Sequence, residues 1–156
     1  MRKSGITIGI CLLVLMLPLR VLAELTIEIT QGVDNPTRIG ISPITHDGKS
    51  LPEDVSKIVS ADLERSGLFK SIPKRDMLSF PATIKEVYYR DWRILGAEYL
   101  VVGKTSQRDG IYQITFSLLE VHSSKAVFTK VVKGSNTQLR DLAHYISDEI
   151  YLAVTG

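Results

Sequence analysis

The sequence is poor in cysteine and histidine, the residues that build disulfide bonds and many metal sites. Its one cysteine, Cys11, excludes an internal disulfide and a cysteine-rich zinc site. Its three histidines are His46, His122 and His144, and no two have the i, i+4 spacing that places two ligands on one face of a helix. There is also no internal repeat, low-complexity tract or run of like charges. The sequence therefore assigns no metal ligand.

Sequence motifs for catalysis are missing as well. The chain has no G-x-S-x-G pattern for a serine nucleophile and no glycine-rich loop that could hold a phosphate. The neighbouring carboxylates Glu53-Asp54 and Asp148-Glu149 fall on expected helices, where adjacent side chains point in different directions and make poor acid–base pairs. His144 and Asp148 have i, i+4 spacing, which is typical of a surface pair. We therefore predict a protein that is not an enzyme and has no catalytic residue, cofactor or metal.

The first 23 residues have the three-part pattern of a secretory signal peptide. A basic start, Arg2-Lys3, precedes an almost wholly apolar run over residues 6–17, and Val21-Leu22-Ala23 offers small or aliphatic residues at a cleavage site. A membrane anchor is the alternative. The apolar run, however, has twelve residues, whereas a spanning helix needs about 20, and Pro18 would interrupt it. We expect cleavage after Ala23.

Removing residues 1–23 changes both the charge and the cysteine content of the chain. Lys+Arg falls from 19 to 16 against 17 Asp+Glu, so the formal net charge goes from +2 to −1. Cys11 is lost too, which suits an oxidising compartment because no thiol remains to be oxidised. We therefore expect a periplasmic protein. The small net charge also argues against a nucleic-acid-binding domain, since such domains carry a clear basic excess.

The residues after the expected cleavage site alternate between apolar and polar side chains. Leu25, Ile27 and Ile29 fall on one side of an extended segment, as in a half-buried strand. Residues 31–36 (QGVDNP) are mostly polar and rich in turn formers. Two interpretations stay open. Residues 24–30 are an ordinary edge strand of the domain, or they leave it and pair with the sheet of a partner.

The rest of the chain predicts an alternation of strands and helices. Strands are expected over residues 38–44, 68–72, 99–105, 112–118 and 126–133. Helices are expected from about residue 52, with Ser50 as the N-cap, over residues 84–95 and over residues 139–154. Helices early and late, with a strand meander between them, indicate an α/β fold on the border of α+β. In this fold, helices cover one face of a mixed sheet.

Four local patterns give sharper expectations. Trp92 is expected to be a packing anchor, and Asp109-Gly110 predicts a tight hairpin turn. Residues 99–105 are almost continuously apolar, which favours a central strand. The clearest amphipathic stripe lies in the last helix, at offsets of 0, 3, 4, 7 and 11: Leu139, Leu142, Ala143, Ile146 and Ile150.

Five stretches of the mature chain carry a resemblance that is specific when they are taken together. They are residues 24–34 (ELTIEITQGVD), 39–44 (IGISPI), 58–69 (IVSADLERSGLF), Trp92 with 95–103 (LGAEYLVVG), and 144–156 (HYISDEIYLAVTG). In this order and spacing they resemble the amino-terminal domain of the TolB family, periplasmic proteins of the Tol–Pal envelope system. The resemblance covers essentially the whole mature chain.

The resemblance implies a roughly five-stranded mixed sheet with two main helices on one face. It also implies a role in outer-membrane integrity and in constriction of the envelope at division. In the family, the first dozen mature residues bind the C-terminal domain of TolA and switch between a docked and a released state. On this chain those residues are Glu24, Leu25, Thr26, Ile27, Glu28, Ile29, Thr30, Gln31, Gly32, Val33, Asp34 and Asn35.

The expected organisation is a signal peptide (1–23), a partner-binding tail (24–36) and an α/β domain (37–156). Family members continue past the position of Gly156 into a β-propeller that docks the lipoprotein Pal, which puts Pal binding in doubt for this sequence. The propeller is also the surface against which the tail docks, so we expect the tail to be constitutively mobile.

The sequence thus predicts a non-enzymatic periplasmic adaptor, and two alternatives stay open. The first is a purely structural domain that orients a propeller, with the tail as a plain edge strand. The second is an unrecognised envelope enzyme, which would need a nucleophile or a metal beside His46, His122 or His144.

Overall fold

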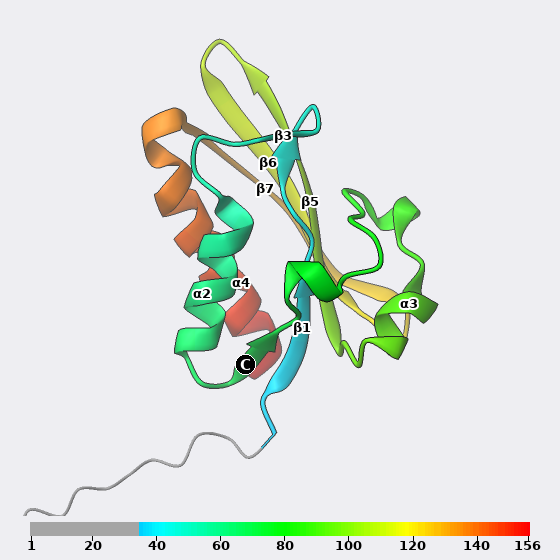
Figure 1. Ribbon diagram of the computed structural model, residues 1–156. Coiled ribbons are helices and arrows are strands. Elements are labelled where there is room, and N and C mark those ends of the chain that lie inside the picture. The colour runs from blue at the N-terminus through cyan, green and yellow to red at the C-terminus, as the bar shows by residue number, and fades with distance from the viewer. Residues whose placement is uncertain (1–34) are drawn as a thin grey trace, which may run out of the picture. The chain divides into compact units, whose positions relative to one another are not determined.

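The computed structural model describes residues 35–156. In this part of the chain, five strands form one mixed sheet with the spatial order β4-β1-β5-β6-β7 (Figure 1). The strands are β1 (Thr37–Ile41), β4 (Phe69–Ser71), β5 (Tyr99–Arg108), β6 (Ile111–Glu120) and β7 (Lys125–Ser135). β1 runs parallel to both β4 and β5, whereas β5, β6 and β7 form an antiparallel meander. The predicted α/β class with a mixed, five-stranded sheet is confirmed.

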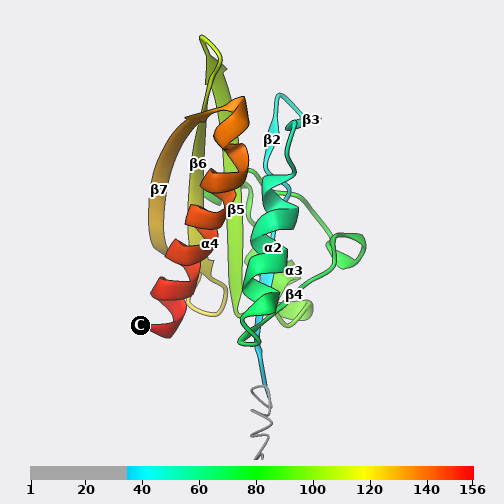
Figure 2. The same cartoon turned by 90° about the vertical axis from the view of Figure 1, so that its left-hand side faces the viewer.

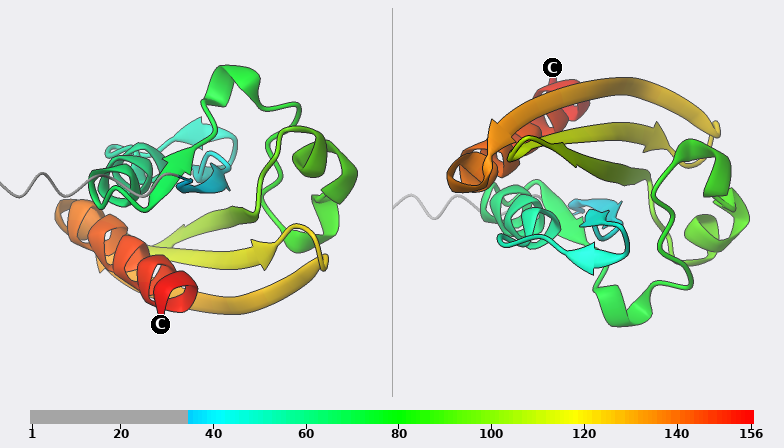
Figure 3. Two further views of the ribbon diagram at one scale, coloured as in Figure 1. Left: turned by 90° about the horizontal axis from the view of Figure 1, so that it is seen from below. Right: turned by 90° about the horizontal axis from the view of Figure 1, so that it is seen from above.

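The helices cover the two faces of the sheet unequally. α2 (Val55–Arg65) and α4 (Leu139–Thr155) lie side by side on one face, and the short α3 (Tyr89–Ile94) lies on the other (Figures 2 and 3). The remaining elements are the ribbon β2 (Thr45–His46) and β3 (Lys49–Ser50), and the 3₁₀ turns η1 (Lys74–Asp76), η2 (Ile84–Glu86) and η3 (Asn136–Gln138). Within residues 35–156, no helix is long and apolar enough to cross a membrane.

The face of the sheet under α2 and α4 buries a continuous apolar core. Successive side chains of a strand point to opposite faces, so alternate residues such as Ile114, Phe116 and Leu118 of β6 all reach this core. The predicted stripe of the last helix packs against them. Its residues Leu139, Ala143, Ile146 and Ile150 are fully buried, and Leu142 is partly buried. The amphipathic pattern of this helix is confirmed.

The other face of the sheet is covered around one indole. Trp92 of α3 is 1% exposed and packs with Leu100 and Val102 of β5, which confirms the predicted packing anchor. The indole of Trp92 also lies directly against Gly40 of β1, which has no side chain to displace it. A Cβ atom at residue 40 would lie 2.5 Å from Cζ3 of Trp92, a distance at which one of the two groups has to move. β5 is buried on both faces at residues 100–102, as a central strand requires.

The predicted hairpin turn between β5 and β6 is confirmed. Asp109 and Gly110 have φ angles of 52° and 78°, and two consecutive left-handed residues are the signature of a type I′ turn. This turn sets the register of the meander, in which Arg108 pairs with Ile111.

The first helix begins later than predicted. Ser50 is not its N-cap, because Ser50 pairs with Thr45 in the β2–β3 ribbon. The turn of that ribbon, Asp47-Gly48, has φ angles of 47° and 73° and folds Ser50 back as a strand residue. Asp54 caps the helix instead, and its Oδ1 accepts a hydrogen bond from Lys57 N–H at 3.0 Å.

The continuous helix predicted over residues 84–95 is wrong. η2 ends at Glu86, whose carboxylate accepts hydrogen bonds from the Ala82 N–H and the Thr83 hydroxyl. These bonds close a local turn, and Val87 and Tyr88, which separate η2 from α3, are residues of low helix propensity. An α-helix therefore forms only over α3, where Trp92 docks on the sheet.

Candidate partner-binding surfaces

The predicted TolA-binding segment enters the described structure only at its last residue. Residues 24–34 lie outside the described part of the chain, and Asn35 is exposed. β1 begins two residues after Asn35, and there Thr37 N–H donates a hydrogen bond to the Leu68 carbonyl oxygen at 2.9 Å. β1 has a paired strand on each side. The predicted segment is therefore attached to a strand in the interior of the sheet.

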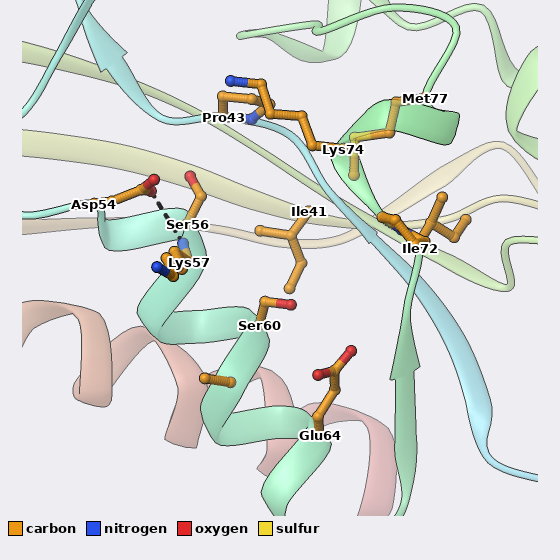
Figure 4. A pocket seen from close by; sticks show the side chains of 12 residues that line it. Ile41, Pro43, Asp54, Ser56, Lys57, Ser60, Glu64, Ile72, Lys74 and Met77 are labelled. Carbon is orange, nitrogen blue, oxygen red and sulfur yellow. Dashed lines mark hydrogen bonds between the residues drawn. The ribbon is translucent and has the colours of Figure 1, made fainter.

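A groove opens between α2 and the segment that joins β4 to η1 (Figure 4). Its volume is about 430 Å³, and its lining includes the apolar side chains of Ile41, Ile72 and Met77. Lys57 and Lys74 also line it. A cavity of this size is within the range of small-ligand sites, which begins at about 300 Å³.

Half of the polar side chains that line the groove are already held by hydrogen bonds. Asp54 caps α2, and Glu64 Oε1 accepts a hydrogen bond from Ser71 N–H at 3.3 Å. Ser56 Oγ accepts from Ile44 N–H at 2.7 Å and donates to a backbone carbonyl. The side chains left to meet another molecule are the apolar ones together with Lys57, Ser60 and Lys74, so the groove offers apolar contact beside two cations.

Among the described residues, Asp62 has the most extensively hydrogen-bonded carboxylate, and it interrupts the apolar face of α2. Its Oδ2 lies 2.6 Å from Nδ1 of His144 and accepts a hydrogen bond from Ser147 Oγ at 3.1 Å, both on α4. Its Oδ1 accepts from Arg65 at 3.0 Å. Burial alone would raise the pKa of Asp62, but the hydrogen bonds from His144 and Ser147 outweigh burial and lower this pKa. The cluster joins the two long helices.

This cluster contains an aspartate, a histidine and a serine, but its connectivity differs from that of a catalytic triad. In a triad the serine hydroxyl donates to the imidazole, whereas Ser147 donates to Asp62 and to the Ala143 carbonyl oxygen. His144 also pairs with Asp62 across the helix interface, rather than with Asp148 as its spacing suggested. The reason is that the side-by-side packing of α2 and α4 brings Asp62 within reach.

The structure gives the three histidines separate partners. His46 Nδ1 lies 3.2 Å from the Thr105 carbonyl oxygen, and its ring meets Tyr112 edge-on. The backbone carbonyl of His122, in the turn after β6, accepts a hydrogen bond from Arg93 at 3.4 Å. In the described range 35–156, no group of three or more His, Cys, Asp or Glu side chains is placed to hold a metal ion.

Sequence reasoning missed both the groove and the Asp62 cluster. The groove is assembled from residues between Ile41 and Met77 on separate elements, and such dispersed residues leave no periodic signal. Asp62 did leave a signal, because a carboxylate on the apolar face of a helix requires buried partners. Its partners could not be identified from the sequence, since His144 lies 82 residues away.

Comparison with known protein families tests the resemblance to the TolB family. A family model described as the TolB amino-terminal domain matches residues 25–127. The chain belongs to the TolB family. The Tol-Pal system protein TolB of Marinomonas sp. (strain MWYL1) is 45% identical over 137 residues, which make up 86% of this chain and 32% of that protein. The TolB of Pseudomonas putida is 38% identical over 156 residues, or 99% of this chain and 35% of that protein.

Solved structures agree with the TolB assignment. The crystal structure of TolB from Acinetobacter baumannii has a TM-score of 0.68 at 29% identity, and the match covers 83% of this chain and 31% of that one. The LpoB C-terminal domain from Escherichia coli has a TM-score of 0.52 at 14% identity, over 67% of this chain and 87% of that one, and shares the fold alone. The chain spans about a third of the length of the curated TolB relatives it matches.

Proposed function

We propose that this chain is a non-enzymatic periplasmic adaptor domain of the Tol–Pal envelope system. It binds the C-terminal domain of TolA through residues 24–35, and thereby supports outer-membrane integrity and constriction of the envelope at division. The observation that carries this proposal is the family match over residues 25–127, because it joins the alternating segment and the α/β domain in one family unit. The relatives' shared name, Tol-Pal system protein TolB, supports the choice of system.

The proposed mechanism is the addition of a strand. The segment pairs with an edge strand of the TolA domain, so backbone hydrogen bonds provide the affinity. Leu25, Ile27 and Ile29 recur at every second residue and provide the specificity, because they project from the same side of the added strand. The segment loses conformational entropy when it is ordered by binding, so we expect modest affinity.

Two features of the described residues support a segment that acts outside the domain. β1 already has a paired strand on each side, so no place beside β1 is open to another strand of the chain. Among the described residues, the fully buried apolar side chains lie between Ile39 and Ile150, downstream of the proposed binding segment.

Calorimetric titration with the TolA C-terminal domain tests the proposal. The chain 24–156 and the truncated chain 36–156 are compared, with thermal melts of both. We expect only the longer chain to bind and both to melt at similar temperatures, because the cores lie within residues 39–150. If neither chain binds while both fold, the TolA proposal is wrong. If the truncation destabilises the domain, the structural alternative replaces it.

A matched pair of substitutions in the segment tests the mechanism. Ile27→Asp places a charge on the apolar side of the alternating segment, whereas Thr26→Asp places the same charge on its polar side. We expect Ile27→Asp to weaken TolA binding by at least about tenfold and Thr26→Asp to have little effect, since burying an unpaired carboxylate is costly. Equal losses in the two variants would contradict a strand with one anchored face.

Amide exchange tests the expected mobility of the segment in the unbound chain. We expect low protection over residues 24–35 beside high protection in β1 and β5, because exchange protection reports the free energy of local opening. Full protection over residues 24–35 would contradict the mobile tail.

A further inference from the structure

The groove between α2 and η1 opens where the chain stops following β1. β4 ends at Ser71, and the next residue, Ile72, still donates its N–H to the Ile39 carbonyl oxygen of β1 at 2.8 Å. Pro73 comes next, and because proline has no N–H it cannot continue the pairing. The chain then turns through η1, and a space is left between this segment and α2 (Figure 4).

The walls of the groove are apolar on one side and short on the other. Ile41 belongs to the apolar core under α2 and α4, whereas Ile72 and Met77 belong to the core on the α3 face. α2 contributes the short side chains of Ser60 and Ala61, and the volume left between the walls is about 430 Å³. An apolar wall of this extent with a few polar groups is typical of a site for a small ligand.

The free charged groups lie towards one end of the groove. Lys57 in the first turn of α2 and Lys74 of η1 both line it, and Figure 4 shows both towards the end where α2 begins. Among residues 35–156, neither lysine forms an ion pair. Nζ of Lys74 lies 5.5 Å from the centre of the Phe80 ring, an attraction that leaves the ammonium open to an anion.

The two carboxylates that line the groove do not cancel this charge. Asp54, near Lys57, already accepts the capping hydrogen bond of α2, and two lysines against one aspartate leave a formal charge of +1 at this end. Glu64 accepts a hydrogen bond from Ser71 N–H and lies seven residues after Lys57, or about 10 Å along the helix axis. The groove therefore has a cationic end, and Glu64 disfavours an anion at the other end.

This distribution favours a small amphiphile over a peptide. An extended peptide brings an N–H and a C=O group at every residue, and these groups need partners when they leave water. Between the two charged ends, however, the one free polar side chain among the described lining residues is Ser60. An alkyl chain needs no polar partner, so a ligand with all its polar atoms at one end fits the groove better.

We propose that the groove binds a fatty acid of medium chain length. Its carboxylate lies between Lys57 and Lys74, and its alkyl chain lies along Ile41 and Ile72. The distance of about 10 Å between the two ends of the groove limits the length of the chain. The site is built from residues 41–77, separate from residues 24–35, so the proposal does not depend on TolA binding.

Two ligands with the same alkyl chain and opposite head groups test the proposal. Decanoate and decyltrimethylammonium are titrated into the chain 24–156 by calorimetry, at concentrations below those at which either forms micelles. We expect decanoate to bind one-to-one and at least about tenfold more tightly than the cation, because the two lysines attract one head group and repel the other. Equal binding of the two ligands, or no saturable binding of decanoate, would overturn the proposal.

Charge reversal provides a matched test on the protein. The double variant Lys57→Glu/Lys74→Glu is expected to weaken decanoate binding by about tenfold or more, since it replaces both cations of the site. The control variant Lys125→Glu/Lys133→Glu makes the same change of net charge on β7, at the other edge of the sheet, and is expected to bind decanoate normally. If the control loses as much affinity, the effect is one of net charge and the assignment to the groove fails.

Filling the groove tests the position of the alkyl chain. Ala61→Leu adds an apolar side chain to the wall of the groove, and Ala153→Leu makes the same change on α4, where Ala153 is exposed. Both alanines are exposed, so we expect both variants to melt near the temperature of the unsubstituted chain. Ala61→Leu should weaken decanoate binding by about tenfold, and Ala153→Leu should leave it unchanged. Equal affinities in two folded variants would contradict a chain that lies in the groove.

Two further measurements address the other possible occupants. A nine-residue peptide that alternates valine and threonine and ends in a free carboxylate is expected not to compete with decanoate. Displacement of decanoate by this peptide would assign the groove to a protein segment. The chains 24–156 and 36–156 are expected to bind decanoate equally, and tighter binding by the shorter chain would assign the groove to residues 24–35. Either of these results would overturn the proposal.

Discussion

The two faces of the sheet are covered in contrasting ways. On one face, two long helices spread their contacts over many aliphatic side chains, among them Ile146 and Ile150. On the other face, the cover is a helix of 6 residues centred on Trp92. So short a helix is not stable by itself, and its position depends on that indole. The first face distributes its stability, whereas the second concentrates it in one side chain.

The largest effect is expected where the contacts are most concentrated. Trp92→Ala should lower the free energy of unfolding by about 3–5 kcal/mol, the usual cost of removing a buried aromatic residue. Urea denaturation measures this change. Tyr88→Ala is the control, because Tyr88 lies next to α3 and is 72% exposed. A loss below about 1 kcal/mol for Trp92→Ala would mean that the α3 face does not depend on the indole.

A single truncation on the distributed face should cost less. Ile146→Ala is expected to lower the free energy of unfolding by about 2–4 kcal/mol, because neighbouring aliphatic side chains can relax into part of the cavity. Leu152→Ala on the same helix is the control, since Leu152 is 62% exposed. A cost for Ile146→Ala above that of Trp92→Ala would reverse the contrast between the two faces.

The contact between Gly40 and Trp92 can be tested by adding an atom rather than removing one. Gly40→Ala should destabilise the domain by about 1–3 kcal/mol, as overpacking of a well-filled core does, because its Cβ would lie 2.5 Å from the indole. A double-mutant cycle with Trp92→Leu measures the coupling. We expect Gly40→Ala to cost less beside leucine, and additive costs would contradict a direct clash.

The smallest effect is expected at the Asp62 cluster between α2 and α4, and it depends on pH. Asp62→Asn should cost about 1–2 kcal/mol at neutral pH, near the lower end of the range of about 1.5–3 kcal/mol for hydrogen bonds to a charged group, because the oxygen of the amide can still accept one of them. The pKa of Asp62 is lowered below the ordinary 3.8. The stabilisation is therefore present above pH 3.8, and it is lost as the pH falls through the lower value of the folded state.

Thermal or urea unfolding of Asp62→Asn and of the unsubstituted chain across this range checks the sign. The difference between the two proteins should shrink as the pH falls below 3.8. Asp141→Asn, on the exposed side of α4, is the control and should show no such change. A difference that grows at low pH would mean that the charged form of Asp62 does not stabilise the fold.

Sequence periodicity predicted the elements whose packing is decided by their own residues. The stripe of α4 and the apolar run of β5 were both confirmed, because helix and strand periods place those residues on defined faces. The Asp109-Gly110 turn was confirmed for a similar local reason. The α/β class followed from the order of these elements, and the resemblance to the TolB family added the number of strands.

The errors arose where distant or competing contacts decide the structure. Ser50 is a sound N-cap by residue type, but the Asp47-Gly48 turn pairs it with Thr45. The helix over residues 84–95 stops because Glu86 bonds back to Ala82 and Thr83. Neither contact has a periodic signature. The predicted binding segment stays a prediction, because residues 24–34 lie outside the described range.

The attachment of residue 35 to β1 has a mechanical consequence. β1 is paired with two parallel neighbours, β4 over residues 37–39 on one side and β5 over residues 39–41 on the other. A partner that pulls on the chain ahead of Thr37 loads β1 along its own axis. The hydrogen bonds to both neighbours are then loaded together in shear. In a hairpin that is pulled apart from its open end, by contrast, the hydrogen bonds break one after another. A tether anchored in this way can pass tension into the domain through a strand that is paired on both sides.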